Sequence, residues 1–226
     1  MSLIEFFLPR TCAMCGKHLA RTEQSVCTSC RYTLPLLHPH SFEYNHVTRL
    51  LLGQIPLQRG FAYIPYDTDT QSHEIVISLK YRQRADVGLA MGHLAASDLL
   101  PKHFFKGIDL LVPVPLAPAR LRKRGYNQAE TLAQGIHEVT GIPLATHLVE
   151  RCHETQTQTH LSADERQQNV SQAFTATGAA TLGAKHLLLI DDVITTGSTI
   201  AACAKAILER HPEVTFSVFT LGVARN

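Results

Sequence analysis

Two adjacent carboxylates are followed by a hydroxyl-rich turn in the C-terminal part of the chain. The apolar run Leu187–Ile190 comes first, Asp191 and Asp192 follow it, and residues 195–199 read Thr-Thr-Gly-Ser-Thr. The apolar run predicts a buried strand that ends at the two acids, and the alanine-rich stretch Ile200–Arg210 predicts a helix after the turn. In an open α/β sheet, ligands bind at the carboxyl ends of strands.

Each part of this stretch suits a different part of one ligand. A helix N-terminus offers unpaired N–H groups and the positive end of a dipole, which suit a phosphate group. Hydroxyl groups add further donors, and Gly197 lets the backbone come close. Ionised carboxylates only accept hydrogen bonds, so the two acids suit the vicinal hydroxyls of a sugar. The stretch therefore predicts a site for a ribose 5-phosphate.

Residues 187–199 resemble the signature of the type I phosphoribosyltransferases. That signature is four apolar residues, two acids, two apolar residues and then T-T-G-x-T, and every position fits it. The resemblance implies that Asp191 and Asp192 hold the 2- and 3-hydroxyls of 5-phosphoribosyl 1-pyrophosphate (PRPP) and are the catalytic residues. It further implies a PRPP-binding turn made of Val193, Thr195, Thr196, Gly197, Ser198 and Thr199.

The acid pair has three other readings. An apolar run before Asp-Asp also occurs in a Walker B strand, but that site needs G-x-x-x-x-G-K-[ST], which the chain lacks. The acid pair of a response regulator comes early in its domain, whereas this pair comes late in the chain. The third reading is a plain buried strand whose acids cap a helix, and the sequence leaves it open.

Composition and charge narrow the class of protein. The chain has 226 residues, of which 45% are apolar and 18% charged, with a net charge of +2. It is long enough for one domain and a small module, and its composition is that of a globular protein. The low net charge argues against a strongly basic nucleic-acid-coating protein. No stretch is apolar for long enough to span a bilayer or has the pattern of a targeting signal, so we expect a cytoplasmic protein without membrane insertion.

Four cysteines near the N-terminus have the spacing of a zinc site. They are Cys12, Cys15, Cys27 and Cys30, arranged as two C-x2-C pairs. Two such pairs supply the four thiolates of a tetrahedral zinc, and a site with four protein ligands is structural rather than catalytic. Two disulfides are disfavoured by a cytoplasmic setting, and a redox pair is disfavoured because no βαβ pattern surrounds either motif.

The rest of the chain alternates strands with helices. We expect strands over residues 61–66, 108–112, 144–149 and 216–221, and helices over 70–82, 86–100 and 127–140, with a shorter helix near 42–52. Pro113 should end the second strand, because proline cannot sit in a central ladder. The basic run Arg120–Arg124 is either a solvated face or a cationic partner for a pyrophosphate.

These motifs together resemble the ComF/GntX family of competence proteins over nearly the whole chain. The family's marks appear in order: a four-cysteine finger, L-K-Y at Leu79–Tyr81, P-V-P at Pro113–Pro115, R-G-Y-N-Q at Arg124–Gln128, T-x-T-Q-T-x-L at Thr155–Leu161, R-x-x-N at Arg166–Asn169, and D-D-V-x-T-T-G. The likeness implies a parallel α/β phosphoribosyltransferase domain over residues 61–226, behind a finger over 1–40 and a linker over 41–60. It also implies an active-site loop over 152–169, which composition alone reads equally well as an exposed loop.

The likeness links the chain to natural transformation, the uptake of single-stranded DNA. For a transferase we expect Mg²⁺-dependent displacement of pyrophosphate from PRPP by an acceptor that the sequence does not identify. The expected pyrophosphate contacts are Lys80, Arg82, Pro113, Val114, Pro115 and Arg124. The alternative is a non-catalytic accessory of the competence machinery that binds PRPP and single-stranded DNA, with basic residues along the DNA backbone and tyrosines for stacking.

Overall fold

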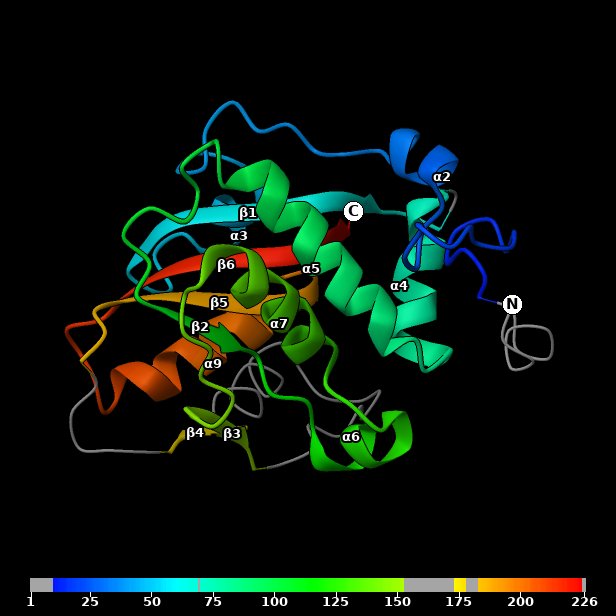
Figure 1. The fold of residues 1–226 in the computed structure, drawn as a ribbon. Coiled ribbons are helices and arrows are strands. Elements are labelled where there is room, and N and C mark those ends of the chain that lie inside the picture. The colour runs from blue at the N-terminus through cyan, green and yellow to red at the C-terminus, as the bar shows by residue number, and fades with distance from the viewer. Residues whose placement is uncertain (1–9, 69, 153–172, 178–182, 225–226) are drawn as a thin grey trace.

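The fold is built on a sheet of four parallel strands. The computed structural model of the protein describes residues 10–68, 70–152, 173–177 and 183–224. The strands β1 (Leu57–Tyr66), β2 (Leu110–Pro113), β5 (His186–Ile194) and β6 (Thr215–Ala224) lie in the order β1-β6-β5-β2 (Figure 1). Each neighbouring pair is parallel. Parallel strands are covered on both faces and read as apolar runs, which is why the sequence predicts all four.

Helices cover both faces of this sheet. In the described residues they are α2 (Thr28–Tyr32), α3 (His46–Leu51), α4 (Ser72–Tyr81), α5 (Ala85–Leu99), α6 (Pro118–Arg124), α7 (Gln128–Thr140) and α9 (Ser198–Leu208). Side chains of α4, α5 and α7 pack on one face, and those of α3 and α9 pack on the other. The short antiparallel pair β3 (Val149–Arg151) and β4 (Phe174–Ala176) packs on the α9 side. A parallel sheet flanked by helices confirms the predicted fold class.

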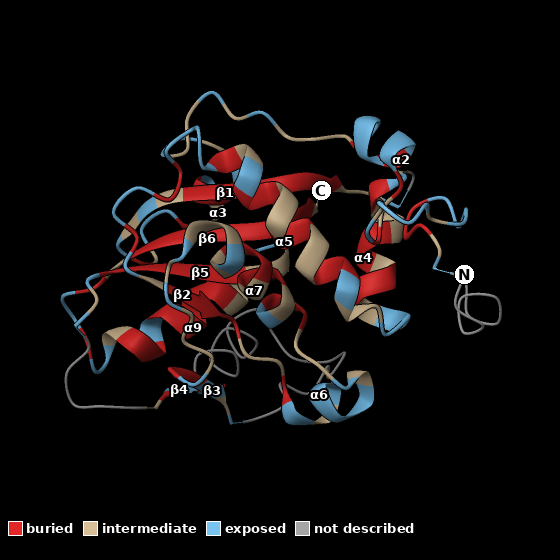
Figure 2. Cartoon of the chain, viewed as in Figure 1, coloured by how far each residue is buried: buried red, intermediate tan, exposed pale blue. Residues whose placement is uncertain are grey.

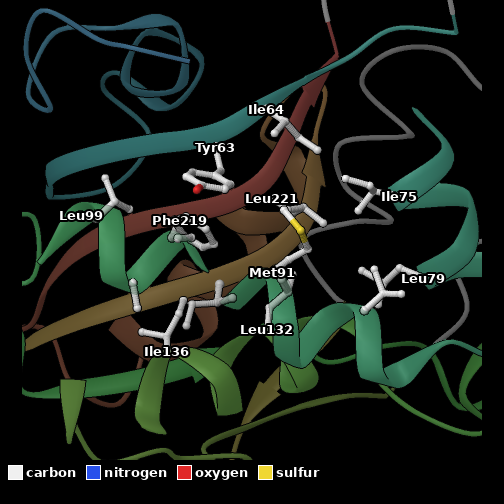
Figure 3. Packing of buried hydrophobic residues seen from close by; sticks show 14 of the residues in the cluster. Tyr63, Ile64, Ile75, Leu79, Met91, Leu99, Leu132, Ile136, Phe219 and Leu221 are labelled. Carbon is white, nitrogen blue, oxygen red and sulfur yellow. The ribbon is translucent and has the colours of Figure 1, made fainter. Parts of the chain in front are cut away.

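Alternate side chains of each strand feed the two apolar clusters. Leu188 of β5 packs with α5 and α7, whereas Leu189 packs with α9. Figure 3 shows the cluster on the α5 and α7 side, where Met91 of α5 lies near Leu221 of β6. The strands are buried along most of their length (Figure 2), so the central sheet is the core of the protein.

Helices α5 and α7 approach each other closely through glycines. A Cβ atom on Gly92 would lie 2.3 Å from the carbonyl oxygen of Leu132, and one on Gly135 would lie 2.3 Å from that of Leu89. Neither position has room for a side chain. The close packing fixes α7, whose first residues border the candidate site.

The N-terminal segment that carries the four cysteines, here called the cysteine module (described from residue 10 to residue 40), shares the core of the sheet domain. Cys12, Ala13 and Met14 are buried in the same apolar cluster as Ile75 and Leu79 of α4. Figure 1 places this N-terminal segment beside α4. The range 41–60, expected as a linker, contains α3 and the first residues of β1.

The central strands β1, β2 and β6 lie within a few residues of their expected bounds, but two other strand predictions need correction. The strand over 187–190 does not end at the acids, because β5 continues to Ile194, which pairs with Val223 of β6. The strand expected over 144–149 is wrong. Leu144 forms a single bridge to Leu111, the chain then turns, and β3 begins only at Val149.

The predicted helices lie close to their expected positions. The predicted helix after Asn127 matches α7, which Asn127 caps and which ends at Gly141 in a left-handed conformation. The helix expected from Ile200 begins two residues earlier, at Ser198. Among the described residues, no helix has the length and apolar character needed to cross a membrane.

Candidate functional site

The two acids lie just beyond the point where a neighbouring strand ends. Strand β2 ends at Pro113, which pairs with Ile190, because proline has no N–H to extend the ladder. On its other side, β5 stays paired with β6, and Asp191 lies opposite Thr220. Successive side chains of a strand point to opposite faces, so Asp191 and Asp192 enter two different environments.

Asp192 lies on the α4 face and forms an ion pair. The Nζ atom of Lys80, in the last turn of α4, lies 3.0 Å from Oδ1 of Asp192. The two side chains are only 18% and 13% exposed, respectively. The same ammonium lies 5.8 Å from the ring centroid of Tyr66, which stacks on His73. Lys80, which was predicted to contact the pyrophosphate, is therefore in contact with Asp192, which was predicted to bind the ribose hydroxyls.

Asp191 lies on the opposite face of the sheet, towards α9. Its Oδ1 atom accepts a hydrogen bond of 2.8 Å from the backbone N–H of Asp192. Burial raises the pKa of Asp191, and the charge of Asp192 raises it further, whereas Lys80 and Arg151 oppose this shift. Burial, together with the charge of Asp191, also raises the pKa of Cys203 on α9.

Arg151 of β3 is a site neighbour that sequence reasoning missed. Its positive charge acts on Asp191, and its guanidinium lies 5.1 Å from the ring centroid of Phe174. No local signal marks this arginine, because its nearness to Asp191 depends on how the β3–β4 pair packs against α9.

The hydroxyl-rich turn leads directly into α9. Gly197 has φ +80° and precedes the first helical residue, Ser198. The hydroxyls of Thr196 and Ser198 lie 3.1 Å apart. A Cβ atom on residue 197 would lie 2.9 Å from Cδ2 of Leu51 in α3. Glycine is therefore required here for both conformation and space, and the first N–H groups of α9, which have no acceptor within the helix, lie next to the turn.

Two further motifs fasten α4 to the start of α7. The hydroxyl of Tyr126 donates to the carbonyl of Leu79. The guanidinium of Arg124 lies 5.5 Å from the ring centroid of Tyr81, and its Nη1 donates to Oε1 of Gln128 at 2.8 Å. The L-K-Y and R-G-Y-N-Q motifs therefore contact each other, although more than forty residues separate them.

The turn after β2 is held to the same assembly. Asn127 caps α7 by accepting from the N–H of Ala129 at 3.1 Å, and its Nδ2 donates to the carbonyl of Val114 at 3.1 Å. The N–H of Val114 donates to the carbonyl of Ile190 at 2.8 Å. Residues 113–115 consequently lie beside the strand that carries the acids.

The three basic residues predicted to contact pyrophosphate have different partners in the structure. Lys80 contacts an acid of the pair, whereas Arg82 pairs with Glu74 at 2.7 Å and Arg124 contacts Gln128 and Tyr81. The motifs over Thr155–Leu161 and Arg166–Asn169 lie outside the described residues, as does nearly all of the loop expected over 152–169.

The four predicted cysteines come together as a candidate metal centre. The sulfur atoms of Cys12, Cys15, Cys27 and Cys30 all lie within 4.8 Å of one another. A Zn–S bond of about 2.3 Å places tetrahedral thiolates about 3.8 Å apart. The Sγ atoms of Cys15 and Cys27 are 3.8 Å apart, which fits that geometry.

The surroundings of Cys12 favour its thiolate form. Burial raises the pKa of Cys12, but hydrogen bonds from the backbone N–H groups of Cys15, Cys27 and Met14 outweigh it and lower the pKa to about 7. The N–H of Cys27 donates to Sγ of Cys12 at 3.3 Å. Burial raises the pKa of Cys30. The donor set fits a structural metal ion that binds thiolates.

The chain is similar in sequence to several known proteins. It is 30% identical over 213 residues to the DNA utilization protein YhgH of Salmonella typhimurium strain LT2, which covers 93% of this chain and 88% of the relative. It is 40% identical over 114 residues to Competence protein F of Haemophilus influenzae, which covers 50% of each chain. It is 32% identical over 120 residues to Competence protein ComFC of Bacillus subtilis, which covers 53% of this chain and 45% of that protein.

No family model matches the chain. Among solved structures, the allosteric regulatory enzyme of purine biosynthesis aligns with a TM-score of 0.38 and 19% identity, which covers 65% of this chain and 30% of that one. So distant a likeness carries no argument.

Proposed function

The chain belongs to the ComF family of competence and DNA utilization proteins, and we propose that it binds PRPP and acts in DNA uptake in the cytoplasm. One observation carries the ligand assignment: only two residues separate the pair Asp191 and Asp192 from the turn that opens α9. In this proposal the turn binds the 5-phosphate and the two acids accept hydrogen bonds from the ribose hydroxyls. Val193, Thr195, Thr196, Gly197, Ser198 and Thr199 complete the binding segment.

The pyrophosphate is proposed to lie on the side of α4 and the turn after β2. Lys80 is the strongest candidate for a contact, because it already touches Asp192. Arg82, Arg124 and residues 113–115 are the other proposed contacts. When bound, Mg²⁺ would neutralise charge on the pyrophosphate; it is held mainly by phosphate oxygens and by one or two carboxylates, a role that Asp191 and Asp192 fit.

The proposed reaction is a transfer of the phosphoribosyl group. The bond from C1 to the pyrophosphate oxygen breaks, a bond from C1 to the acceptor forms, and the acceptor loses a proton. The contribution of the chain is to hold the sugar in position and to stabilise the charge that develops on the leaving group.

Calorimetric titration with PRPP and Mg²⁺ tests the ligand assignment. We expect the wild type to bind, and the double variant Asp191→Asn/Asp192→Asn to lose binding. Glu209→Gln is the matched control, because Glu209 is an exposed acid at the C-terminal end of α9, the end opposite the turn. No heat with the wild type, or equal binding by the double variant, would remove the assignment.

A non-catalytic role in DNA binding is the second candidate, and α6 favours it. None of the residues of α6 is buried, and its sequence is Pro-Ala-Arg-Leu-Arg-Lys-Arg. Tyr81, which Arg124 overlies, is 68% exposed. Basic side chains that follow a backbone, next to an exposed aromatic ring, suit single-stranded DNA.

Two measurements separate these candidates. Release of pyrophosphate from PRPP with one member of a panel of bases and amines would establish a transferase. DNA binding that weakens with salt, and weakens further in Arg120→Gln/Arg122→Gln/Lys123→Gln, would support the accessory role. Lys102→Gln/Lys106→Gln is the control, since these exposed lysines lie beyond the end of α5. A flat response to salt would contradict the DNA interface.

We propose zinc as the metal of the cysteine centre. Four thiolates at tetrahedral spacing leave no open position for a substrate, so the role would be structural. Other proteins of the competence machinery are proposed as partners on the strength of the family alone.

A further inference from the structure

The cysteine module contacts the helix that carries Lys80. The hydroxyl of Ser78 in α4 donates to the backbone carbonyl of Ala13 at 3.2 Å. Ala13 lies between Cys12 and Cys15, inside the first C-x2-C pair, and the Ser78 side chain is almost fully buried. The backbone of the candidate metal-binding turn is thus in direct contact with α4.

The same helix reaches the ligand site two residues later. Lys80 forms the 3.0 Å ion pair with Asp192. Between Ser78 and Lys80, the carbonyl of Leu79 accepts the hydrogen bond from Tyr126. Three consecutive residues of the last turn therefore contact the cysteine module, the start of α7 and the acid pair.

A second set of contacts joins the module to α5. The hydroxyl of Ser25 donates to Oδ2 of Asp86 at 2.8 Å, and Arg84, which binds Asp86 through two nitrogens, donates to the carbonyl of Thr11 at 3.1 Å. Helix α5 carries none of the residues assigned to the ligand site. Among the described residues, the module thus has one hydrogen bond to the helix that reaches the site, and others to a region that does not reach it.

We propose that α4 couples the metal-bound state of the cysteine module to the affinity of the sugar-phosphate site, with Ser78 as the positioning residue at their contact. The proposal rests on the proposed function for the identity of the ligand. When the metal leaves, the turn around Ala13 loses the constraint that fixes its carbonyl. Ser78 then loses its acceptor in a buried position, the apolar contacts of Cys12 and Met14 with α4 loosen, and Lys80 is no longer held against Asp192.

Coupling between two binding sites is reciprocal, and this supplies two independent measurements. If the metal raises the affinity for PRPP, bound PRPP must also raise the affinity for the metal. The first measurement is calorimetric binding of PRPP to zinc-loaded protein. The second is the rate at which zinc passes to a chromophoric chelator, with and without PRPP.

The test compares Ser78→Ala with Ser25→Ala. Each variant removes one hydrogen bond between the module and the rest of the chain, but only the first bond ends on α4. Ser78→Ala also removes the acceptor of a 3.5 Å hydrogen bond from Nη1 of Arg82, so the effect of PRPP on zinc release, which reports on the module, is the deciding measurement for this variant. We expect both variants to retain one zinc per chain. We expect Ser78→Ala to bind PRPP about fivefold more weakly or worse, and Ser25→Ala to stay within about twofold of wild type, because site-to-site coupling is commonly at least about fivefold. PRPP should slow zinc release in the wild type and in Ser25→Ala, and much less in Ser78→Ala.

Three outcomes would overturn either the α4 route or the proposed function. Equal weakening of PRPP binding by both variants would overturn the α4 route, since any loosening of the module would then suffice. Unchanged binding and unchanged zinc release in Ser78→Ala would also overturn it. A wild type that binds no PRPP would instead overturn the proposed function, and this inference with it.

Discussion

The hydroxyl of Tyr126 donates a hydrogen bond to the backbone carbonyl of Leu79, and this bond joins the last turn of α4 to the start of α7. It brings the L-K-Y and R-G-Y-N-Q motifs into direct contact. Each is short and undistinguished in the sequence, but in the fold they form one contact that sets the position of Lys80 relative to Asp192.

Removal of this hydroxyl should loosen α4 without changing a ligand-site residue. We expect Tyr126→Phe to lower the free energy of unfolding by about 1 kcal/mol, because a half-buried carbonyl at a helix end loses its donor. Chemical denaturation measures this loss. Tyr44→Phe is the control, because Tyr44 is 87% exposed. Equal stability of the two variants would mean that the bond contributes nothing.

Gly197 should tolerate no side chain. We expect Gly197→Ala to lose more than about 1–2 kcal/mol, since the left-handed conformation alone costs about that much for an L-residue and the new Cβ would also press on Leu51. Gly53→Ala separates the two causes, because Gly53 has φ +72° with no atom within 4 Å of its Cβ position. Chemical denaturation of both variants decides the point, and losses of the same size would show that Leu51 yields freely.

Local signals account for what the sequence predicts well. Asn127 and Gly141 mark the two ends of α7 by their own backbone preferences. The two C-x2-C pairs predict their own cluster, because each pair brings its thiols together within one turn. The acid pair and the turn before α9 lie within a dozen residues of one another, so their arrangement could also be predicted.

The failures concern contacts with distant parts of the chain. The acids do not end β5, because β6 is long enough to pair with Val193 and Ile194. The expected strand over 144–149 reduces to one bridge beside β2. The ion pair of Lys80 with Asp192 joins residues more than a hundred positions apart, and no periodic pattern reports such a contact.

The cysteine centre should stabilise the whole protein. We expect one zinc per chain by metal analysis. Because its cysteines share a core with α4, Cys12→Ser should lose the metal and lower the melting temperature of the sheet domain as well. Cys152→Ser should keep both, since Cys152 is exposed and lies outside the cluster. A sheet domain that melts at the same temperature without zinc would contradict the shared core.

His186 should make stability depend on pH. Burial lowers the pKa of His186, and Arg59 lowers it further, while the carbonyl of Gly107 and the charge of Asp109 oppose the shift. The unfolded chain therefore takes up the proton first as the pH falls below about 6.5, so the free energy of unfolding decreases with acidification until the folded histidine is also protonated.

Substitution should flatten this part of the pH profile. His186→Gln loses hydrogen bonds to Gly107 and Ser217 and should be less stable than wild type at neutral pH, but its stability should fall less between about pH 7 and pH 5. His40→Gln is the control, because His40 is exposed. Parallel profiles for wild type and His186→Gln, measured by denaturation at several pH values, would refute the assignment.

The ion pair of Lys80 and Asp192 can be weighed by a double-mutant cycle. Both side chains are largely buried, so loss of one partner leaves a charge without compensation, whereas loss of both does not. We expect Lys80→Met and Asp192→Asn each to lower the free energy of unfolding, by up to about 3–5 kcal/mol when a buried partner is removed, and the double variant to lose clearly less than the sum. Arg82→Met with Glu74→Gln is the matched cycle for a more exposed pair, which should give an interaction energy below about 1 kcal/mol. If the two cycles give the same interaction energy, Lys80 and Asp192 are held no more firmly than an ordinary surface pair.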